Sequence, residues 1–86
     1  MSVERLDAIV PPHRFTLDGT TVTIWEVIKL QLVSGDTMYH VLVELSYKGK
    51  RSQRFPLDAR DWKDLLKKLL VEIPKFKLAV LMGYVR

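Results

Sequence analysis

The sequence contains no cysteine, so the chain has neither a disulfide nor a thiolate that could act as nucleophile or metal ligand. Its two histidines, His13 and His40, are far apart and match no metal-ligand spacing, so we expect no metal site and no cofactor. No apolar run approaches the ~20 residues of a membrane span, and residues 1–7 carry acids instead of an apolar signal segment. We therefore expect a soluble, cytoplasmic protein with no membrane partner.

Asparagine is also absent, and glutamine occurs only at Gln31 and Gln53, while charged residues make up 28% of the chain. Few thermolabile amides beside many ions are typical of thermophile proteins. A chain of 86 residues forms one small domain whose own core leaves a thin margin of stability. Because neither disulfides nor a metal can add to that margin, we expect self-association as a homo-oligomer, a dimer or a tetramer.

The sequence motifs of the common enzyme classes are missing as well. There is no G-x-S-x-G, no glycine-rich phosphate loop and no pair of histidines, and each of the four glycines lies at a predicted turn or near a chain end. One sheet and one helix layer of this size leave little room for a substrate pocket within a subunit. We therefore expect no enzymatic activity.

Turn residues divide the chain into a series of strands followed by a helical region. Between the turns at Gly19, Gly35 and Gly49, the segments are rich in β-branched and aromatic residues. The predicted strands are residues 13–18, 21–33, 38–48 and 51–57, and a short helix capped by Ser2 is predicted at residues 3–10. The fold class is thus α+β: a four-stranded antiparallel meander with one face covered by a long C-terminal amphipathic helix.

The single predicted domain, residues 1–86, consists of an N-terminal segment (1–12), the sheet (13–57) and the helical region (58–86). Asp58 is the predicted helix N-cap, with Asp61 three residues on. Apolar residues then recur at helical spacing and should cover the sheet: Trp62, Leu65, Leu66, Leu69, Leu70 and Ile73. Pro74 should break the helix, and the apolar residues after it should pack in a protein interface.

Alternation along a strand assigns its residues to two faces of the sheet. In the second strand the even positions are predicted to face the core, namely Val22, Ile24, Ile28, Leu30 and Leu32. The odd positions, which include Trp25 and Lys29, then face outward, as do Arg14 and His40 by the same count. In the third strand Tyr39 to Tyr47 point inward at odd positions. A ring as large as that of Trp25 should contact something, either a base or another subunit.

Cations cluster around the turn between the third and fourth strands, with no acid between residues 46 and 57. Single-stranded nucleic acid needs cations for its phosphates and flat rings for its bases. The predicted binding residues are Trp25, Lys29, His40, Tyr47, Lys48, Lys50, Arg51 and Arg54. The same charges would also suit a solvated sheet edge that prevents aggregation. The alternative function is therefore a structural assembly module that binds a protein partner through the open sheet face and the apolar C-terminal tail.

Residues 47–65 resemble the transcriptional positive-coactivator family, whose fold is related to the Whirly proteins. The shared pattern is an aromatic strand end, a basic turn, a short apolar strand and then Leu-Asp/Asn-x-x-x-Trp-x-x-Leu entering a helix. Leu57, Asp58, Trp62 and Leu65 match this pattern, and the resemblance covers about residues 39–72. By its order of strands and helix and its small basic chain, the sequence is also similar to the ThermoDBP group of archaeal single-stranded DNA-binding proteins.

These resemblances imply sequence-tolerant binding of single-stranded DNA, or of RNA, in a cleft of a curved sheet, with oligomerisation through helices. Tyr47, Lys48, Lys50, Arg51 and Arg54 occupy the positions of the family's aromatic and basic strand-end residues. Trp25 has no counterpart in the family pattern. The apolar tail after Pro74 and residues 3–10 also depart from that pattern.

Overall fold

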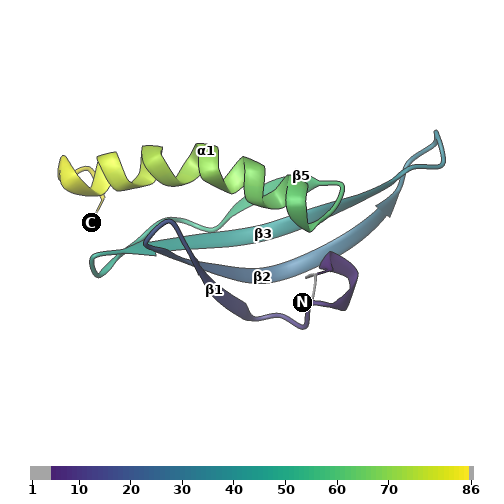
Figure 1. Cartoon of the computed structure of the whole chain (residues 1–86), viewed down its shortest axis with the longest axis horizontal. Helices are drawn as coiled ribbons and strands as arrows, with labels where there is room; N and C mark the ends of the chain where they lie inside the picture. Colours follow the sequence, from purple (N-terminus) through teal and green to yellow (C-terminus); the bar gives the residue numbers. More distant parts are fainter. Residues whose placement is uncertain (1–4, 86) are drawn as a thin grey trace.

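In a computed structural model, which describes residues 5–85, five antiparallel strands form one sheet and a long helix packs along one of its faces (Figure 1). The strands are β1 (His13–Leu17), β2 (Thr20–Gln31), β3 (Thr37–Tyr47), β4 (Lys50–Arg51) and β5 (Phe55–Ala59), followed by helix α1 (Trp62–Leu81). The predicted α+β class is confirmed. The predicted N-terminal helix is instead a single 3-10 turn, η1 (Leu6–Ala8), and its predicted cap Ser2 lies outside the described residues.

Two tight hairpin turns fix the register at one end of the sheet. Asp18 and Gly19 have φ of 50° and 72°, and Lys48 and Gly49 have φ of 51° and 76°. Two successive positive φ values are the geometry of a two-residue turn whose twist matches that of the strands. The first turn sets Leu17 opposite Thr20 on β1 and β2, and the second pairs β3 with β4 in the same way.

The predicted fourth strand, residues 51–57, is divided into two pieces that both pair with β3. Between them, Ser52 keeps the chain attached, because its backbone N–H donates to the Leu45 carbonyl at 2.8 Å and its Oγ accepts from the Leu45 N–H at 2.9 Å. β5 then pairs with the first half of β3, from Val43 back to Tyr39. The chain between the pieces bulges, and this bulge carries Arg54.

The core lies between the sheet and α1. Leu65, Leu69, Ile73 and Phe76 recur at helical spacing and are buried against inward-facing residues of the strands. The strand contribution consists of Val22, Ile24, Val41, Val43 and Leu45. Leu70, predicted to join this face, is about half exposed.

Helix α1 runs unbroken through Pro74, so the predicted break there is wrong. Proline in a helix interior removes one backbone hydrogen bond and costs ~3 kcal/mol or more. Pro74 itself is exposed, so its ring does not disturb the core, while Ile73 and Phe76 on either side of it are buried. Burial of these neighbours holds the helix against the sheet past the proline.

The helix begins three residues later than predicted, because Asp58 still pairs with His40 as part of β5. Asp61 is the N-cap, and its carboxylate accepts from the Asp64 N–H at 2.8 Å. In return the Asp64 carboxylate accepts from the Arg60 N–H at 3.0 Å. This hydrogen bond, assisted by the nearby Lys68 ammonium and opposed by desolvation, lowers the pKa of Asp64 from its ordinary value.

A β-bulge at Trp25 changes the alternation along β2. Ile24 pairs with Val43 and Glu26 with Leu42, so Trp25 is an extra residue without a cross-strand partner. Beyond the bulge the two faces exchange, which makes the predicted inward positions of Ile28 and Leu30 wrong, since both are exposed on the face away from α1. Leu32, the third of these residues, lies beyond the end of β2 and is exposed as well.

The second half of β2 and the first half of β3 extend past α1 as a ribbon, which we call the hairpin arm (residues 28–40) (Figure 1). The arm is two-stranded beyond Tyr39, where the pairing of β3 with β5 ends. Its four successive β2 residues, 28–31, are all exposed, and successive strand residues point to opposite faces. Both faces of β2 are therefore exposed along the arm.

Candidate nucleic-acid interface

The face of the sheet opposite α1, which we call the outer face, carries a shallow hollow of about 400 Å³. Two rows of paired residues cross the strands there: Arg14, Thr23 and Glu44 form one row, and Thr21, Ser46 and Arg51 form the next. Trp25 also lines the hollow. Apart from the indole ring, the lining consists of hydroxyl and charged groups.

Trp25, which lines this hollow, forms a stacked pair with Arg54. The Arg54 Cζ lies 3.9 Å from the centroid of the indole ring, which is a close cation–π contact. The bulge in β2 supplies the ring, and the bulged chain between β4 and β5 supplies the arginine. The indole Nε1 is buried and finds no acceptor among residues 5–85. The pair thus depends on two bulges, one on each side of β3.

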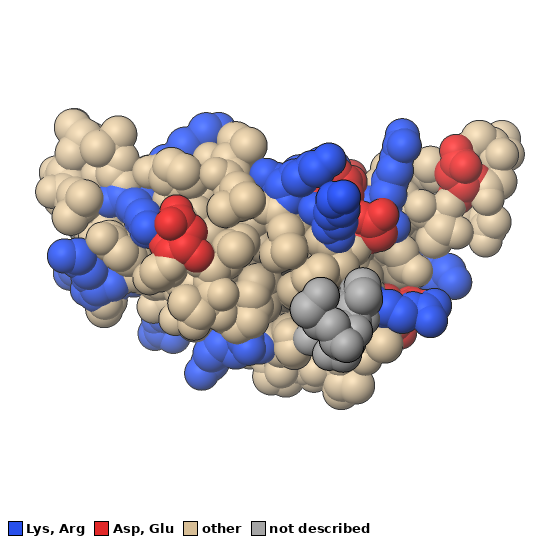
Figure 2. Space-filling model, in the orientation of Figure 1, with Lys and Arg blue, Asp and Glu red and all other residues tan. Residues whose placement is uncertain are grey.

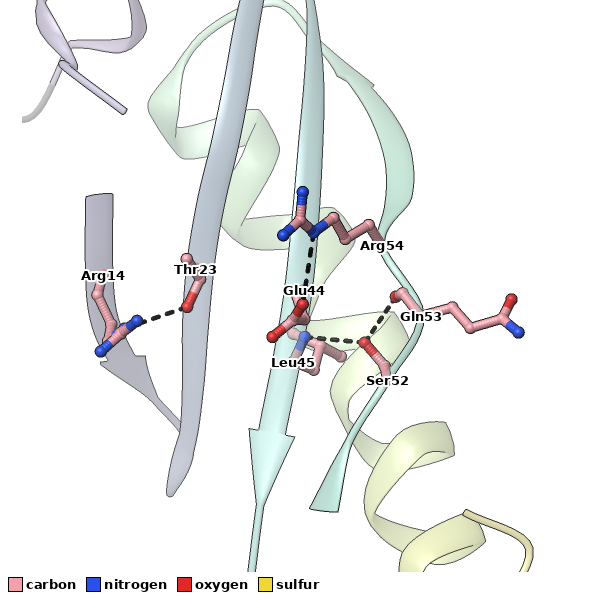
Figure 3. Close-up of polar contacts among 7 residues, drawn as sticks. All are labelled: Arg14, Thr23, Glu44, Leu45, Ser52, Gln53 and Arg54. Atoms are coloured by element: carbon pink, nitrogen blue, oxygen red, sulfur yellow. Dashed lines mark hydrogen bonds and ion pairs between the residues drawn. The ribbon is translucent and has the colours of Figure 1, made fainter. Parts of the chain in front are cut away.

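Glu44 holds Arg54 in this position. The Arg54 Nε lies 3.6 Å from Glu44 Oε1, and the Glu44 side chain is only 13% exposed (Figure 3). Since Nε faces the carboxylate, the terminal nitrogens of the guanidinium are left for other acceptors. The ion pair also neutralises the Arg54 charge locally.

Arg14 and Arg51 stand on opposite sides of the hollow. The Arg14 Nε donates to Thr23 Oγ1 at 3.3 Å, which orients the guanidinium over the outer face (Figure 3). Arg51 is exposed on β4 across from Ser46. Because strands lie ~4.8 Å apart, the backbones of β1 and β4 are about 14 Å apart across the hollow.

Of the predicted binding residues, the structure brings Trp25, Arg51 and Arg54 together. His40 lies on the same outer face but farther along the sheet, where its Nδ1 is 2.7 Å from the Asp58 carboxylate. It stands across from Ile28, in the half of the face that the bulge makes aliphatic.

The structure separates the other predicted residues from this site. Lys29 pairs with Tyr39, and the exchange of faces at the bulge puts it on the helix side, opposite to Trp25. Tyr47 is half-buried on the helix side, with the Lys48 Nζ at 5.7 Å and the Lys77 Nζ at 5.3 Å from its ring centroid. Lys50 pairs with Tyr47 and takes the same side. Tyr47 and Trp25, the two predicted stacking residues, therefore lie on opposite faces of the sheet.

The predicted set omits Arg14 and Glu44, although both line the hollow. Alternation does place Arg14 on the outer face, but only the register of the β1–β2 hairpin shows that it stands in the same row as Glu44. Figure 2 shows the molecule in the orientation of Figure 1, with Lys and Arg spread over many elements. Charge density along the sequence is therefore a poor guide to this site.

Within residues 5–85, no group of three or more potential ligand side chains could hold a metal ion. The described part of the chain also has no helix with the length and apolar character needed to cross a membrane. In comparisons with known proteins, no family model, no curated protein and no solved structure matches the chain. The resemblance to single-stranded DNA-binding proteins remains a prediction, and the function is argued below from the outer face.

Proposed function

We propose that this protein is a cytoplasmic, non-enzymatic binder of single-stranded nucleic acid, DNA in the first place and RNA as well, and that it binds through the outer face. The observation that carries the proposal is the stacked pair of Trp25 and Arg54, whose indole ring lines the same hollow as Arg14 and Arg51. Flat stacking surfaces and nearby cations are the two requirements for sequence-tolerant binding of a single strand.

A base can stack on the outer plane of the Arg54 guanidinium, with the Trp25 ring beneath it. Bases stack on guanidinium planes as well as on aromatic rings, and the guanidinium is planar and weakly hydrated. Glu44 favours this arrangement because it fixes the plane through Nε. Double-stranded DNA keeps its bases stacked on one another, so the platform favours single strands.

The two remaining arginines suit phosphates of the same bound strand. Arg14 and Arg51 stand on β1 and β4, so a bound strand would cross the sheet at a steep angle to its strands. The separation of about 14 Å across three strand spacings corresponds to about four nucleotides at the ~3.4 Å rise of a stacked strand. Hydroxyls of Thr21 and Ser46 line the route between the arginines.

The test is the binding of labelled oligonucleotides of about ten nucleotides, which lies within known site sizes for single strands. Fluorescence anisotropy would compare oligo-dT, oligo-U and a matched duplex at low and moderate salt. We expect saturable binding of the single strands, weaker binding of the duplex, and weakening of both by salt. Equal binding of duplex and single strand, or no binding of any of the three, would overturn the proposal.

A second readout shows whether binding occurs at the proposed platform. In a Trp62→Phe variant Trp25 is the sole tryptophan, and Phe is a conservative replacement because Trp62 packs against the Phe15 ring at 5.0 Å. Its emission should change on addition of oligo-dT. In the matched Trp25→Phe variant the remaining Trp62 should not respond. A response of Trp62 alone would place the bound strand elsewhere.

If no oligonucleotide binds, the alternative function gains support. The half of the outer face beyond the bulge carries Ile28, Leu30 and Leu42, an aliphatic surface suited to a protein partner. The protein would then be an assembly module that uses this face and its C-terminal apolar residues.

A further inference from the structure

Helix α1 has a second apolar face, on the side turned away from the sheet. Its exposed members, which we call the outer stripe, are between 48% and 63% exposed and comprise Leu70, Val71, Leu78, Leu81 and Met82. At about 100° per residue they fall within an arc of about 120°, with Pro74 inside it, and the core residues lie on the opposite side of the helix.

A helix that packs on a sheet normally presents charged and polar residues to solvent. The C-terminal part of α1 does not: in the view of Figure 2 its surface is mostly uncharged, whereas cations and acids gather over the first turns. A contiguous exposed apolar patch on a small protein marks an interaction site.

We propose that the outer stripe binds the outer stripe of a second copy of this chain, with the two helices antiparallel. The distribution of charge along α1 favours a second copy of the chain as the partner and an antiparallel arrangement of the two helices. The last turn of α1 contains no basic residue to balance the negative end of the helix dipole, whereas Lys63 and Lys67 lie near its first turns on the side of the stripe. In an antiparallel pair, the lysines of each copy stand beside the C-terminal end of the other.

The positions of the apolar residues fit a two-fold axis near Pro74. Leu70 and Leu78 lie four residues to either side of it, so Leu70 of one copy meets Leu78 of the second copy, and the reverse contact follows by symmetry. Pro74 has no long side chain, which allows the helices to approach closely at the axis.

The expected contact is small. The helix of 20 residues is about 30 Å long and about 10 Å wide, so one helix face per copy buries an area at the low end of specific interfaces. We therefore expect a dimer that dissociates at low micromolar concentration. The stripe lies on the far side of α1 from the sheet, so the dimer leaves both outer sheet faces open.

Cysteine trapping tests the direction of the helices directly, because the chain contains no cysteine of its own. When the Leu70→Cys and Leu78→Cys variants are mixed and oxidised, the mixed disulfide dimer should form at least tenfold faster than either variant links to itself. Self-linking of both variants would indicate parallel helices, and absence of any linking in a protein that is dimeric would place the interface elsewhere, for example on the hairpin arm. Either result overturns the proposal.

Sedimentation equilibrium tests the surface itself. Leu78→Glu should be monomeric at concentrations at which the wild type is dimeric, with an unchanged far-ultraviolet circular dichroism spectrum. Val33→Glu, at the exposed tip of the hairpin arm, is the matched control and should remain dimeric. A wild type that stays monomeric at high micromolar concentration, or a dimeric Leu78→Glu, would refute the proposal. Both measurements use the protein alone, so their failure does not affect the proposed nucleic-acid binding.

Discussion

The ion pair between Arg54 and Glu44 makes a quantitative prediction about salt. Each phosphate neutralised by a cation contributes about −0.7 to the slope of log affinity against log salt for a single strand. In the outer face Arg14 and Arg51 are available for phosphates, whereas the charge of Arg54 is already balanced by Glu44 at 3.6 Å. Two effective contacts give a slope of about −1.4.

Two variants should move that slope in opposite directions, and a third should leave it unchanged. Removing one phosphate contact in Arg51→Gln should reduce it to about −0.7, and releasing the charge of Arg54 in Glu44→Gln should steepen it to about −2.1. Between about 50 and 200 mM salt, oligo-dT affinity should therefore fall about 7-fold in the wild type, about 2.6-fold in Arg51→Gln and about 18-fold in Glu44→Gln. Lys50→Gln, on the opposite side of the sheet, is the control and should match the wild type.

The assay is fluorescence anisotropy of one labelled oligo-dT at several salt concentrations, with circular dichroism to confirm that each variant is folded. A Glu44→Gln variant with the slope of the wild type would show that Arg54 does not exchange its partner for phosphate. If Lys50→Gln lowered the slope while Arg51→Gln did not, the strand would run along the hairpin turn and the proposed route across the outer face would be wrong.

Three further predictions concern stability. Leu69 is fully buried, so Leu69→Ala should lower the free energy of unfolding by about 2–5 kcal/mol. Leu70→Ala should cost less than half as much in urea titrations of the monomer, because Leu70 is half exposed in the single chain. Ser52→Ala leaves the Leu45 N–H without its acceptor, and the same assay should show a loss of about 1–3 kcal/mol; an unchanged stability would show that this hydrogen bond does not hold the edge of β3. The fold lowers the pKa of Asp64, so its ionised carboxylate stabilises the folded protein at pH values above the pKa of Asp in the unfolded chain, about 3.9. This stabilisation is lost as the pH falls through the lower pKa of the folded state. Asp64→Asn should therefore melt below the wild type at neutral pH and alongside it in strong acid, and a constant gap across that range would contradict the capping role.

The order and type of the elements could be predicted from the sequence because their signals are local. Asp18-Gly19 and Lys48-Gly49 favour tight turns, and the β-branched segments between them favour strands. The helix boundary could not be placed as well, because Asp58 and Asp61 are equally good caps and only pairing of β5 with β3 decides between them. The same holds for Pro74, whose local cost is outweighed by burial of its neighbours.

The faces of β2 were predicted correctly up to Trp25 and wrongly beyond it. Alternation of faces assumes that each residue of β2 pairs with one residue of β3, and the bulge at Trp25 adds a residue to β2. No glycine or proline next to Trp25 indicates this bulge in the sequence. This single residue explains why Lys29 is absent from the site and why Ile28 and Leu30 are exposed. The site also depends on register across four strands, which puts Arg14 in the same row as Glu44, and no pattern within one strand contains that information.

The hairpin arm and the part of the sheet covered by α1 should differ in local stability. Amides of Val22 and Ile24, under the helix, should open only with global unfolding, whereas those of the exposed ribbon can open by separation of two strands alone. Hydrogen exchange should therefore be fastest toward the tip and slow progressively toward the covered sheet. A partner that binds the arm should hold its two strands together. Its binding would therefore be detected most sensitively as slower hydrogen exchange of the amides in the arm.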